Sequence, residues 1–285
     1  MDPLFSEILI QKRFSNMKTF LAKLSILWIV CTLNVQIQAE PSSQNEAIVS
    51  GWQAAEGQFP WHVILRRDAG DQLLCGASLI SDKWVLTCAH CLEEEDSVLV
   101  VFGSIQLSNS DVNMTSTKLY IYPHYDEENL INDMGLVELP TPVTFSNNIQ
   151  AITLVTAEEE ALKNHFIGAK AIISGFGWIS DMANMNNEWL LWTSVDVIDN
   201  SICAHVYNEE IEDSIICAQG PNGTYQSPCD GDSGGALVWK NEANNFVQIG
   251  IYSFSKKNNC SRFPSGYTRV SSYLDYIHNI TGLNL

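Results

Sequence analysis

The chain has 285 residues, of which 46% are hydrophobic and 10% aromatic, and its formal net charge is −18. This length allows one large domain or two smaller ones, each with a buried core. Such an acidic chain repels phosphates, which argues against nucleic acid and anionic membranes as partners.

The N-terminal segment has the pattern of a secretory signal. A stretch with two lysines is followed by an apolar run over residues 24–33 and by the small residue Ala39, where a signal peptidase would cut. The run is too short to span a bilayer as a helix. We therefore predict a signal-peptide region over residues 1–39, a short polar propeptide over residues 40–47, and a protein that is secreted to the extracellular space.

From Ile48 onward, short apolar runs recur at regular spacing and are separated by turn residues, which is typical of an all-β barrel or sandwich protein. The predicted strands cover residues 61–65, 77–80, 84–88, 97–102, 119–122, 134–139, 171–174, 190–197, 214–218, 235–239, 246–253 and 266–270. Apolar residues recur at helical spacing only over residues 270–280, which predicts a C-terminal helix.

Seven cysteines remain after the signal region is removed with Cys31. An oxidising compartment favours disulfides, and an odd number leaves at least one thiol free, but counting alone does not decide the pairing. Glycosylation sequons also suit a secreted surface. They begin at Asn113, Asn222 and Asn279.

Residues 229–235, Cys-Asp-Gly-Asp-Ser-Gly-Gly, place Ser233 on a glycine-rich turn. Such a turn presents the serine hydroxyl outward, and its backbone N–H groups can converge on an oxyanion. The same composition also occurs in ordinary turns between strands. Ser233 is thus a candidate nucleophile, and it requires a base and an orienting acid elsewhere in the chain.

The candidate base and acid each lie next to an apolar strand. His90 ends a buried-strand pattern over residues 84–91, and Asp133 precedes the apolar run over residues 134–139. The ordinary alternatives are a core or surface histidine and a turn residue that begins a strand. The glycines around Ser233 also match the Gly-x-Ser-x-Gly elbow of α/β-hydrolases, but that fold needs its acid and histidine after the serine. Because His278 is the only histidine after Ser233, and no βαβ alternation precedes Ser233, we reject that fold.

Three segments resemble the chymotrypsin-like serine proteases in the order His, Asp, Ser. They are Thr-Cys-Ala-His-Cys at 87–91, Asn-Asp-Met-Gly-Leu at 132–136 and Gly-Asp-Ser-Gly-Gly at 231–235. The resemblance runs from Ile48 to the region of Ile280 and looks most like arthropod digestive chymotrypsin-like and collagenolytic members. It implies an all-β, trypsin-like fold over residues 48–285, with two six-stranded antiparallel β-barrels and a C-terminal helix, and a serine endopeptidase activity.

The resemblance also implies a role for each matching residue. Ser233 attacks the scissile carbonyl, His90 takes and returns the proton, Asp133 holds the imidazole, and the N–H groups of Gly231 and Ser233 form the oxyanion hole. The implied disulfides are Cys75–Cys91, Cys203–Cys217 and Cys229–Cys260, which leave Cys88 as a free, buried thiol. No cofactor and no metal are expected, since a Cys-x-His-Cys metal site at Cys88 lacks a second ligand cluster.

In this family, cleavage before a residue such as Ile48 frees an amine that pairs with the aspartate before the nucleophile, here Asp232. A buried carboxylate without a partner is costly, so this pair can act as a switch. Ala47 stands where the family usually has Arg or Lys. A trypsin-like activator is therefore not expected: either an elastase-like or other protease cuts there, or the chain stays an inactive zymogen.

The family's specificity pocket maps to a floor at Ser227 and walls at Ser253, Phe254, Ser255 and Ser265. A serine floor gives Arg or Lys substrates no salt bridge. Serines in place of the usual wall glycines should narrow the slot. We predict a chymotrypsin- or elastase-like preference for small or medium apolar residues before the cut.

Polypeptide substrates, an activating protease and protein inhibitors are the expected partners of a monomer. The alternative is a secreted, non-catalytic or unactivated homologue that acts as a binding protein. Such homologues commonly lose the serine or the histidine, whereas His90, Asp133 and Ser233 are all present here.

Overall fold

The structure is a computed structural model, and it describes residues 48–67, 72–207 and 211–285. The predicted signal peptide and propeptide, residues 1–39 and 40–47, lie outside the described residues. In the part of the chain that is described, no helix has the length and hydropathy needed to cross a membrane.

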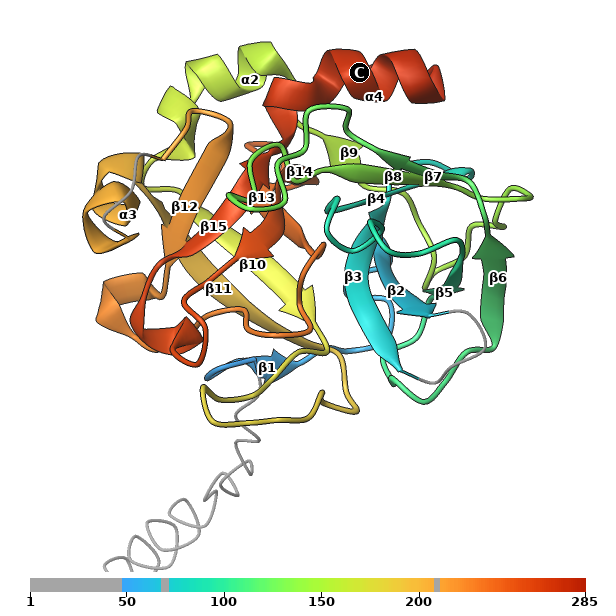
Figure 1. Ribbon diagram of the computed structural model, residues 1–285, viewed down its shortest axis with the longest axis horizontal. Coiled ribbons are helices and arrows are strands. Elements are labelled where there is room, and N and C mark those ends of the chain that lie inside the picture. The colour runs from blue at the N-terminus through green and yellow to red at the C-terminus, as the bar shows by residue number, and fades with distance from the viewer. Residues whose placement is uncertain (1–47, 68–71, 208–210) are drawn as a thin grey trace, which may run out of the picture. The chain divides into compact units, whose positions relative to one another are not determined.

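The first half of the described chain forms a seven-stranded antiparallel sheet (Figure 1). Its strand order is β6-β5-β2-β3-β4-β8-β7. In chain order the strands are β2 (His62–Arg67), β3 (Leu73–Leu79), β4 (Trp84–Thr87), β5 (Val98–Phe102), β6 (Val112–Ser116), β7 (Leu119–Ile121) and β8 (Gly135–Glu138).

The second half forms an eight-stranded sheet in the order β1-β11-β10-β13-β14-β15-β12, with β9 added in parallel to β14. A further pairing between β11 and β12 closes this sheet on itself. Its strands are β1 (Trp52–Gln53), β9 (Thr153–Leu154), β10 (Lys170–Gly175), β11 (Leu191–Ile198), β12 (Ile215–Gln219), β13 (Ala236–Lys240), β14 (Phe246–Phe254) and β15 (Ser265–Arg269).

The all-β prediction is confirmed, and the strand counts exceed six because short strands join each sheet; β1 and β9 have two residues each. The C-terminal helix is also confirmed: α4 (Leu274–Thr281) follows the 3-10 turn η4 (Val270–Tyr273). The sequence pattern did not predict α2 (Ala157–Leu162), which has only six residues, or α3 (Asn200–Tyr207), whose apolar residues gather less clearly on one face than those of α4. Three further 3-10 turns are η1 (Asn164–Phe166), η2 (Pro221–Gly223) and η3 (Cys260–Arg262).

One hydrophobic core extends through both sheets. The rings of Phe59 and Trp61, just before β2, pack on Phe246 of β14 with centroids 6.5 and 4.9 Å away. Beside them, Ser78 Oγ on β3 donates a 2.7 Å hydrogen bond to Gln248 Oε1 on β14. The two sheets therefore meet along β3 and β14, whose neighbouring turns carry the candidate site.

Three disulfides join β3 to the turn after β4, α3 to β12, and the turn before Ser233 to η3. They are Cys75–Cys91, Cys203–Cys217 and Cys229–Cys260, the pairs that the family resemblance implies. Cys88 is a free, buried cysteine. The asparagines of the three sequons, Asn113, Asn222 and Asn279, are exposed.

A buried ion pair ties α2 to the end of β15. Arg269 lies 8% exposed and Glu160 lies 4% exposed, and the Arg269 guanidinium donates to the Glu160 carboxylate. Arg269 Nη2 also donates to the carbonyl of Ile215 at 2.8 Å. Removing one member of such a pair leaves the other charge buried without compensation.

We therefore expect Arg269→Met to lower the free energy of unfolding by about 3 kcal/mol, because among the described residues the buried Glu160 carboxylate then keeps only the Ser271 hydroxyl and the His165 ring, 3.5 Å away, as partners. Urea unfolding would measure this. The matched control is Arg262→Met at an exposed position, which should change stability by less than about 0.5 kcal/mol. Equal effects of the two substitutions would contradict the importance of the pair.

Candidate active site

Asp133 is fully buried two residues before β8 and accepts hydrogen bonds from two other elements. His90 contributes two donors: its Nδ1 lies 2.8 Å from Asp133 Oδ2 and its backbone N lies 2.9 Å from Oδ1. Ser253 Oγ on β14 donates to the same Oδ2 at 2.5 Å. The backbone carbonyl of Asp133 accepts from Thr268 Oγ1 on β15 at 2.7 Å. These bonds compensate the buried charge and fix the position of the carboxylate.

His90 lies on the turn after β4, and its side chain is 27% exposed. Because Nδ1 faces a carboxylate, Nδ1 carries the proton, and the Nε2 lone pair is left to accept one. Burial lowers the pKa of His90, but the neighbouring Cys88 sulfur and the Asp133 carboxylate raise it more, so the net shift is upward. Nε2 lies 3.5 Å from Cys88 Sγ. The imidazole is thus oriented and made more basic.

The turn that carries Ser233 packs tightly against β3 and β14. Gly76 N on β3 donates to Ser233 O at 2.8 Å, and Gly234 N donates to Tyr252 O at 2.8 Å. Gly234 has φ +81°, and a Cβ there would lie 2.2 Å from both Gly76 O and Thr87 Oγ1. Only glycine fits this approach. The turn therefore contacts Thr87 at the end of β4, three positions before His90. It also contacts Tyr252 on β14, which precedes Ser253.

The structure thus brings the Ser233 turn to the boundary where His90 and Asp133 meet. Within the described residues, no hydrogen bond joins Ser233 Oγ to His90 Nε2. Catalytic hydrogen bonds are often long or poorly aligned until substrate binds.

Two backbone donors of this turn are available to a ligand. The N–H groups of Asp232, Gly234 and Gly235 donate to backbone carbonyls. Among the described residues, those of Gly231 and Ser233 donate to none. Gly231 adopts φ +95°, which favours glycine. These two N–H groups have the chemistry of an anion-binding pair.

Asp232 is a second buried carboxylate, and it differs from Asp133 in its partners. Gly177 N and Cys229 N donate to it at 2.8 and 2.9 Å. No ion pair reaches it from any residue that the structure describes. Burial raises its pKa to about 7, although the two N–H groups act in the opposite direction. Ile48 is also fully buried, and Val49 forms a β-bridge with Ser227.

The predicted pocket residues are satisfied by internal hydrogen bonds. Ser227 Oγ donates to Pro228 O at 2.8 Å, and Ser265 Oγ lies 2.9 Å from the Tyr267 hydroxyl. Ser255 Oγ accepts from the Tyr252 hydroxyl at 2.8 Å. The ring of Phe254 lies over Gly266, where an added Cβ would be 2.2 Å from it. Ser253 differs from the others, because its hydroxyl donates to Asp133.

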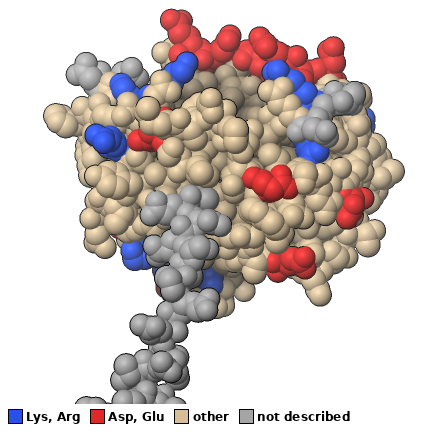
Figure 2. All heavy atoms as spheres, turned by 90° about the horizontal axis from the view of Figure 1, so that it is seen from below, with Lys and Arg blue, Asp and Glu red and all other residues tan. Residues whose placement is uncertain are grey.

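A cleft of about 340 Å³ lies beside His90 and is lined by carboxylates that the sequence analysis did not identify. They are Glu93, Glu94, Glu95 and Glu127. The signal for the first three was the acidic run that follows Cys91. In the space-filling view of Figure 2, Asp and Glu side chains gather along the upper edge of the molecule, and Lys and Arg side chains are scattered. Arg67 also lines the cleft and pairs with Glu95, so the lining keeps a net negative charge, which favours basic over acidic polypeptide segments. Larger cavities of about 510 Å³ are lined by other residues and do not include His90.

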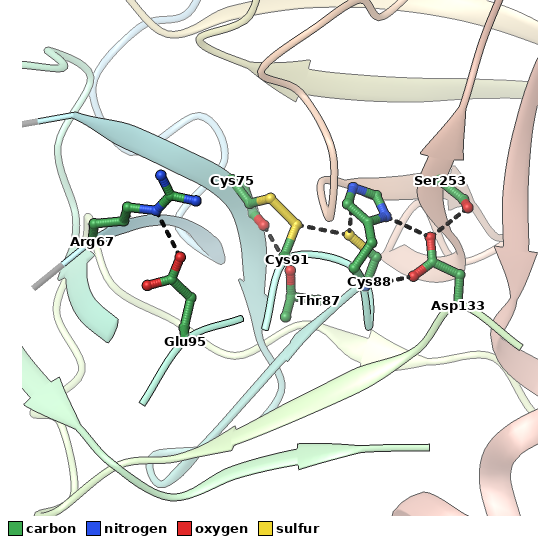
Figure 3. The surroundings of a disulfide bond; sticks show 10 residues. Arg67, Cys75, Thr87, Cys88, Cys91, Glu95, Asp133 and Ser253 are labelled. Atoms are coloured by element: carbon green, nitrogen blue, oxygen red, sulfur yellow. Dashed lines mark hydrogen bonds and ion pairs between the residues drawn. A yellow bond between two sulfur atoms is a disulfide. The ribbon is translucent and has the colours of Figure 1, made fainter. Parts of the chain in front are cut away.

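Ligand atoms of Cys75, Cys88, His90 and Cys91 all lie within 4.8 Å of one another (Figure 3). The Cys75–Cys91 disulfide occupies two of these four groups. Cys88 and His90 remain, and two ligands are fewer than a zinc site requires. The group therefore does not fit a metal while this disulfide is formed.

Comparisons with known proteins agree with this geometry. The protein-family model described as "Trypsin" matches residues 48–277. A collagenase of Hypoderma lineatum is 36% identical over 240 residues, which cover 83% of this chain and 88% of that protein. Vitamin K-dependent protein C of Oryctolagus cuniculus is 32% identical over 242 residues, and transmembrane protease serine 9 of Rattus norvegicus is 30% identical over 240. These matches cover 52% and 22% of the two longer proteins.

A solved structure has a similar fold. The structure titled "HL collagenase structure at 1.7A resolution" superposes with a TM-score of 0.73 at 35% identity. The match covers 83% of this chain and all of that one.

The buried Asp232 carboxylate should make the stability of the chain depend on pH as long as the bond before Ile48 is uncut. Its pKa is about 7 in the folded protein against an ordinary value of 3.8. As pH rises from 3.8 to 7, the unfolded carboxylate ionises before the folded one, so stability should fall by up to about 4 kcal/mol and then level off. Urea unfolding at a series of pH values measures this loss.

Asp232→Asn should remove most of that pH dependence, whereas Asp82→Asn at an exposed position should leave it in place. If Asp232→Asn retains the full loss, the buried carboxylate is not its source.

Proposed function

The chain belongs to the trypsin family of serine proteases, and from this we propose that it is a secreted endopeptidase that cuts polypeptides with Ser233, His90 and Asp133. The single observation that carries the proposal is the fully buried Asp133 carboxylate, which accepts both Nδ1–H and backbone N–H of His90. This arrangement holds the imidazole with Nε2 free to accept a proton, as a general base requires.

In the proposed reaction, Ser233 Oγ attacks the scissile carbonyl while His90 Nε2 takes its proton. Nε2 must therefore turn its interaction from Cys88 Sγ to Ser233 Oγ when substrate arrives. The negative charge on the former carbonyl oxygen is met by the N–H groups of Gly231 and Ser233, and each donor contributes about 3 kcal/mol in comparable sites. His90 then gives the proton to the leaving amine, and water repeats the sequence on the acyl-enzyme.

Activation is proposed to follow cleavage between Ala47 and Ile48. The buried Asp232 carboxylate, with a raised pKa and only N–H partners, is suited to receive a new ammonium group. Ile48 is already buried and its neighbour Val49 pairs with Ser227, so the segment lies close to the predicted pocket floor. Because Ala47 is not basic, an elastase-like or other non-tryptic protease is the proposed activator.

The proposed substrates have small or medium apolar residues before the cut. Ser227 offers no fixed negative charge, and Ser265 takes space that glycine would leave open. One relative and one solved structure that match this chain are named collagenases. Collagen is accordingly one protein substrate to test, in keeping with the resemblance to arthropod digestive members. The protein is proposed to act as a monomer, with an activating protease and protein inhibitors as its regulatory partners.

Covalent labelling tests the nucleophile. After processing to an Ile48 N-terminus, a fluorophosphonate should label Ser233, and peptide mapping should find the adduct there. Ser233→Ala should lose the label, and Asp133→Asn should lower kcat by about 10⁴-fold because the imidazole tautomer is no longer fixed. Ser201→Ala, at an exposed serine, is the matched control and should label normally.

N-terminal sequencing must accompany the labelling. Correctly processed protein that takes no label would favour a non-catalytic binding homologue. A mature terminus other than Ile48 would contradict the activation proposal. The same labelling experiment would still test Ser233 as the nucleophile.

A panel of chromogenic peptides that differ only before the cut tests specificity. The largest kcat/KM is expected for small or medium apolar residues. Ser227→Asp should raise kcat/KM for Arg by about tenfold or more, because it adds the missing charge. Ser265→Gly, which widens the slot instead, should improve Phe and Tyr and leave Arg slow. Fastest cleavage after Arg by the native protein would refute the pocket assignment.

A further inference from the structure

The sulfurs of Cys75, Cys88 and Cys91 lie together where the turn after β4 meets β3 (Figure 3). Cys91 is bonded to Cys75, and the free Cys88 Sγ lies 2.8 Å from Cys91 Sγ. Figure 3 shows the Cys91 sulfur between the sulfurs of Cys75 and Cys88. A thiol on the far side of a disulfide sulfur is positioned to attack it and to expel the other sulfur.

The reaction needs a thiolate, and a base is within reach. Burial raises the pKa of Cys88, as does Asp133, while His90 lowers it. His90 Nε2 lies 3.5 Å from Cys88 Sγ. Since Nδ1 is engaged by Asp133, Nε2 is the ring atom that can accept the thiol proton. The cysteine is otherwise enclosed, being 0% exposed.

We propose that Cys88 can replace Cys75 as the disulfide partner of Cys91, so that the protein has two disulfide isomers. The Cys88 thiol gives its proton to His90, and its thiolate attacks Cys91 Sγ. The Cys88–Cys91 bond forms as the Cys75–Cys91 bond breaks, and Cys75 leaves as a thiolate that takes the proton back. One disulfide and one thiol are present before and after, so no oxidant or reductant is consumed.

The spacing allows the second isomer. Cys88-Ala89-His90-Cys91 has the Cys-x-x-Cys spacing of disulfides that exchange readily. In the first isomer the bridge ties the His90 turn to β3 across 16 residues. In the second it encloses His90 in a short ring and releases that turn from β3. It also removes the Cys88 thiol as a partner of Nε2.

The exchange goes beyond the proposed function, since it uses neither Ser233 nor a substrate. Only its consequence for catalysis, a change in the surroundings of the proposed base, rests on that function. The position of the free thiol can be mapped whether or not the protein cuts polypeptides.

The experiment maps the free thiol in the native protein. Folded protein is kept in mild acid or equilibrated at mildly alkaline pH, then quenched in acid, unfolded, blocked with an alkylating reagent and digested. We expect label on Cys75 to rise from background to more than about 1% of chains after the alkaline incubation, with an equal loss at Cys88. Label confined to Cys88 under every condition, or found on Cys91 instead of Cys75, would overturn the proposal.

Two variants sharpen the result. Cys88→Ser has no free thiol to start the exchange, so Cys75 should stay unlabelled; label there would mean that the bridge opens without Cys88. His90→Asn removes the proposed proton acceptor and should slow the appearance of label on Cys75 by at least about tenfold. An unchanged rate would overturn the part assigned to His90.

Discussion

The burial of the Asp133 charge is the constraint on which the site depends. A carboxylate with no exposed surface is tolerated only when donors surround it, and here they come from the turn after β4 and from β14. Its backbone carbonyl is bound by β15 as well. The two sheets are therefore fixed against each other at the point where His90 must be oriented. The chemistry of the imidazole follows from the packing of the sheets.

The two buried aspartates serve different purposes because their partners differ. Asp133 is compensated by His90 and Ser253 in the structure as it stands. Asp232 has only two backbone donors, and burial raises its pKa. Gly175 and Gly177 leave room for its carboxylate, since a Cβ at either would lie within 2.6 Å of it. A saturated carboxylate suits a permanent site, whereas an undercompensated one suits a switch that awaits a cation.

Much of this could be predicted from the sequence. The spacing of short apolar runs indicated an all-β fold, and the motifs around His90, Asp133 and Ser233 indicated the family, which the comparisons confirm. The bond from Ser253 to Asp133 could not be predicted, because it joins residues 120 positions apart. The contact of Cys88 with the bonded Cys91 depends on how one turn closes. Helix α2 was missed because six residues show too little periodicity, and α3 because its apolar residues gather less clearly on one face than those of the equally long α4.

The proposed reaction depends on Asp133 orienting His90 as the base for Ser233. The most direct measurement is a crystal structure of the processed protein with a phosphonate bonded to Ser233. One phosphonate oxygen is expected to accept from the N–H groups of Gly231 and Ser233, while His90 keeps both bonds to Asp133 and turns Nε2 from Cys88 to the adduct. An Nε2 that stays on Cys88, or an adduct oxygen that meets neither N–H group, would contradict it.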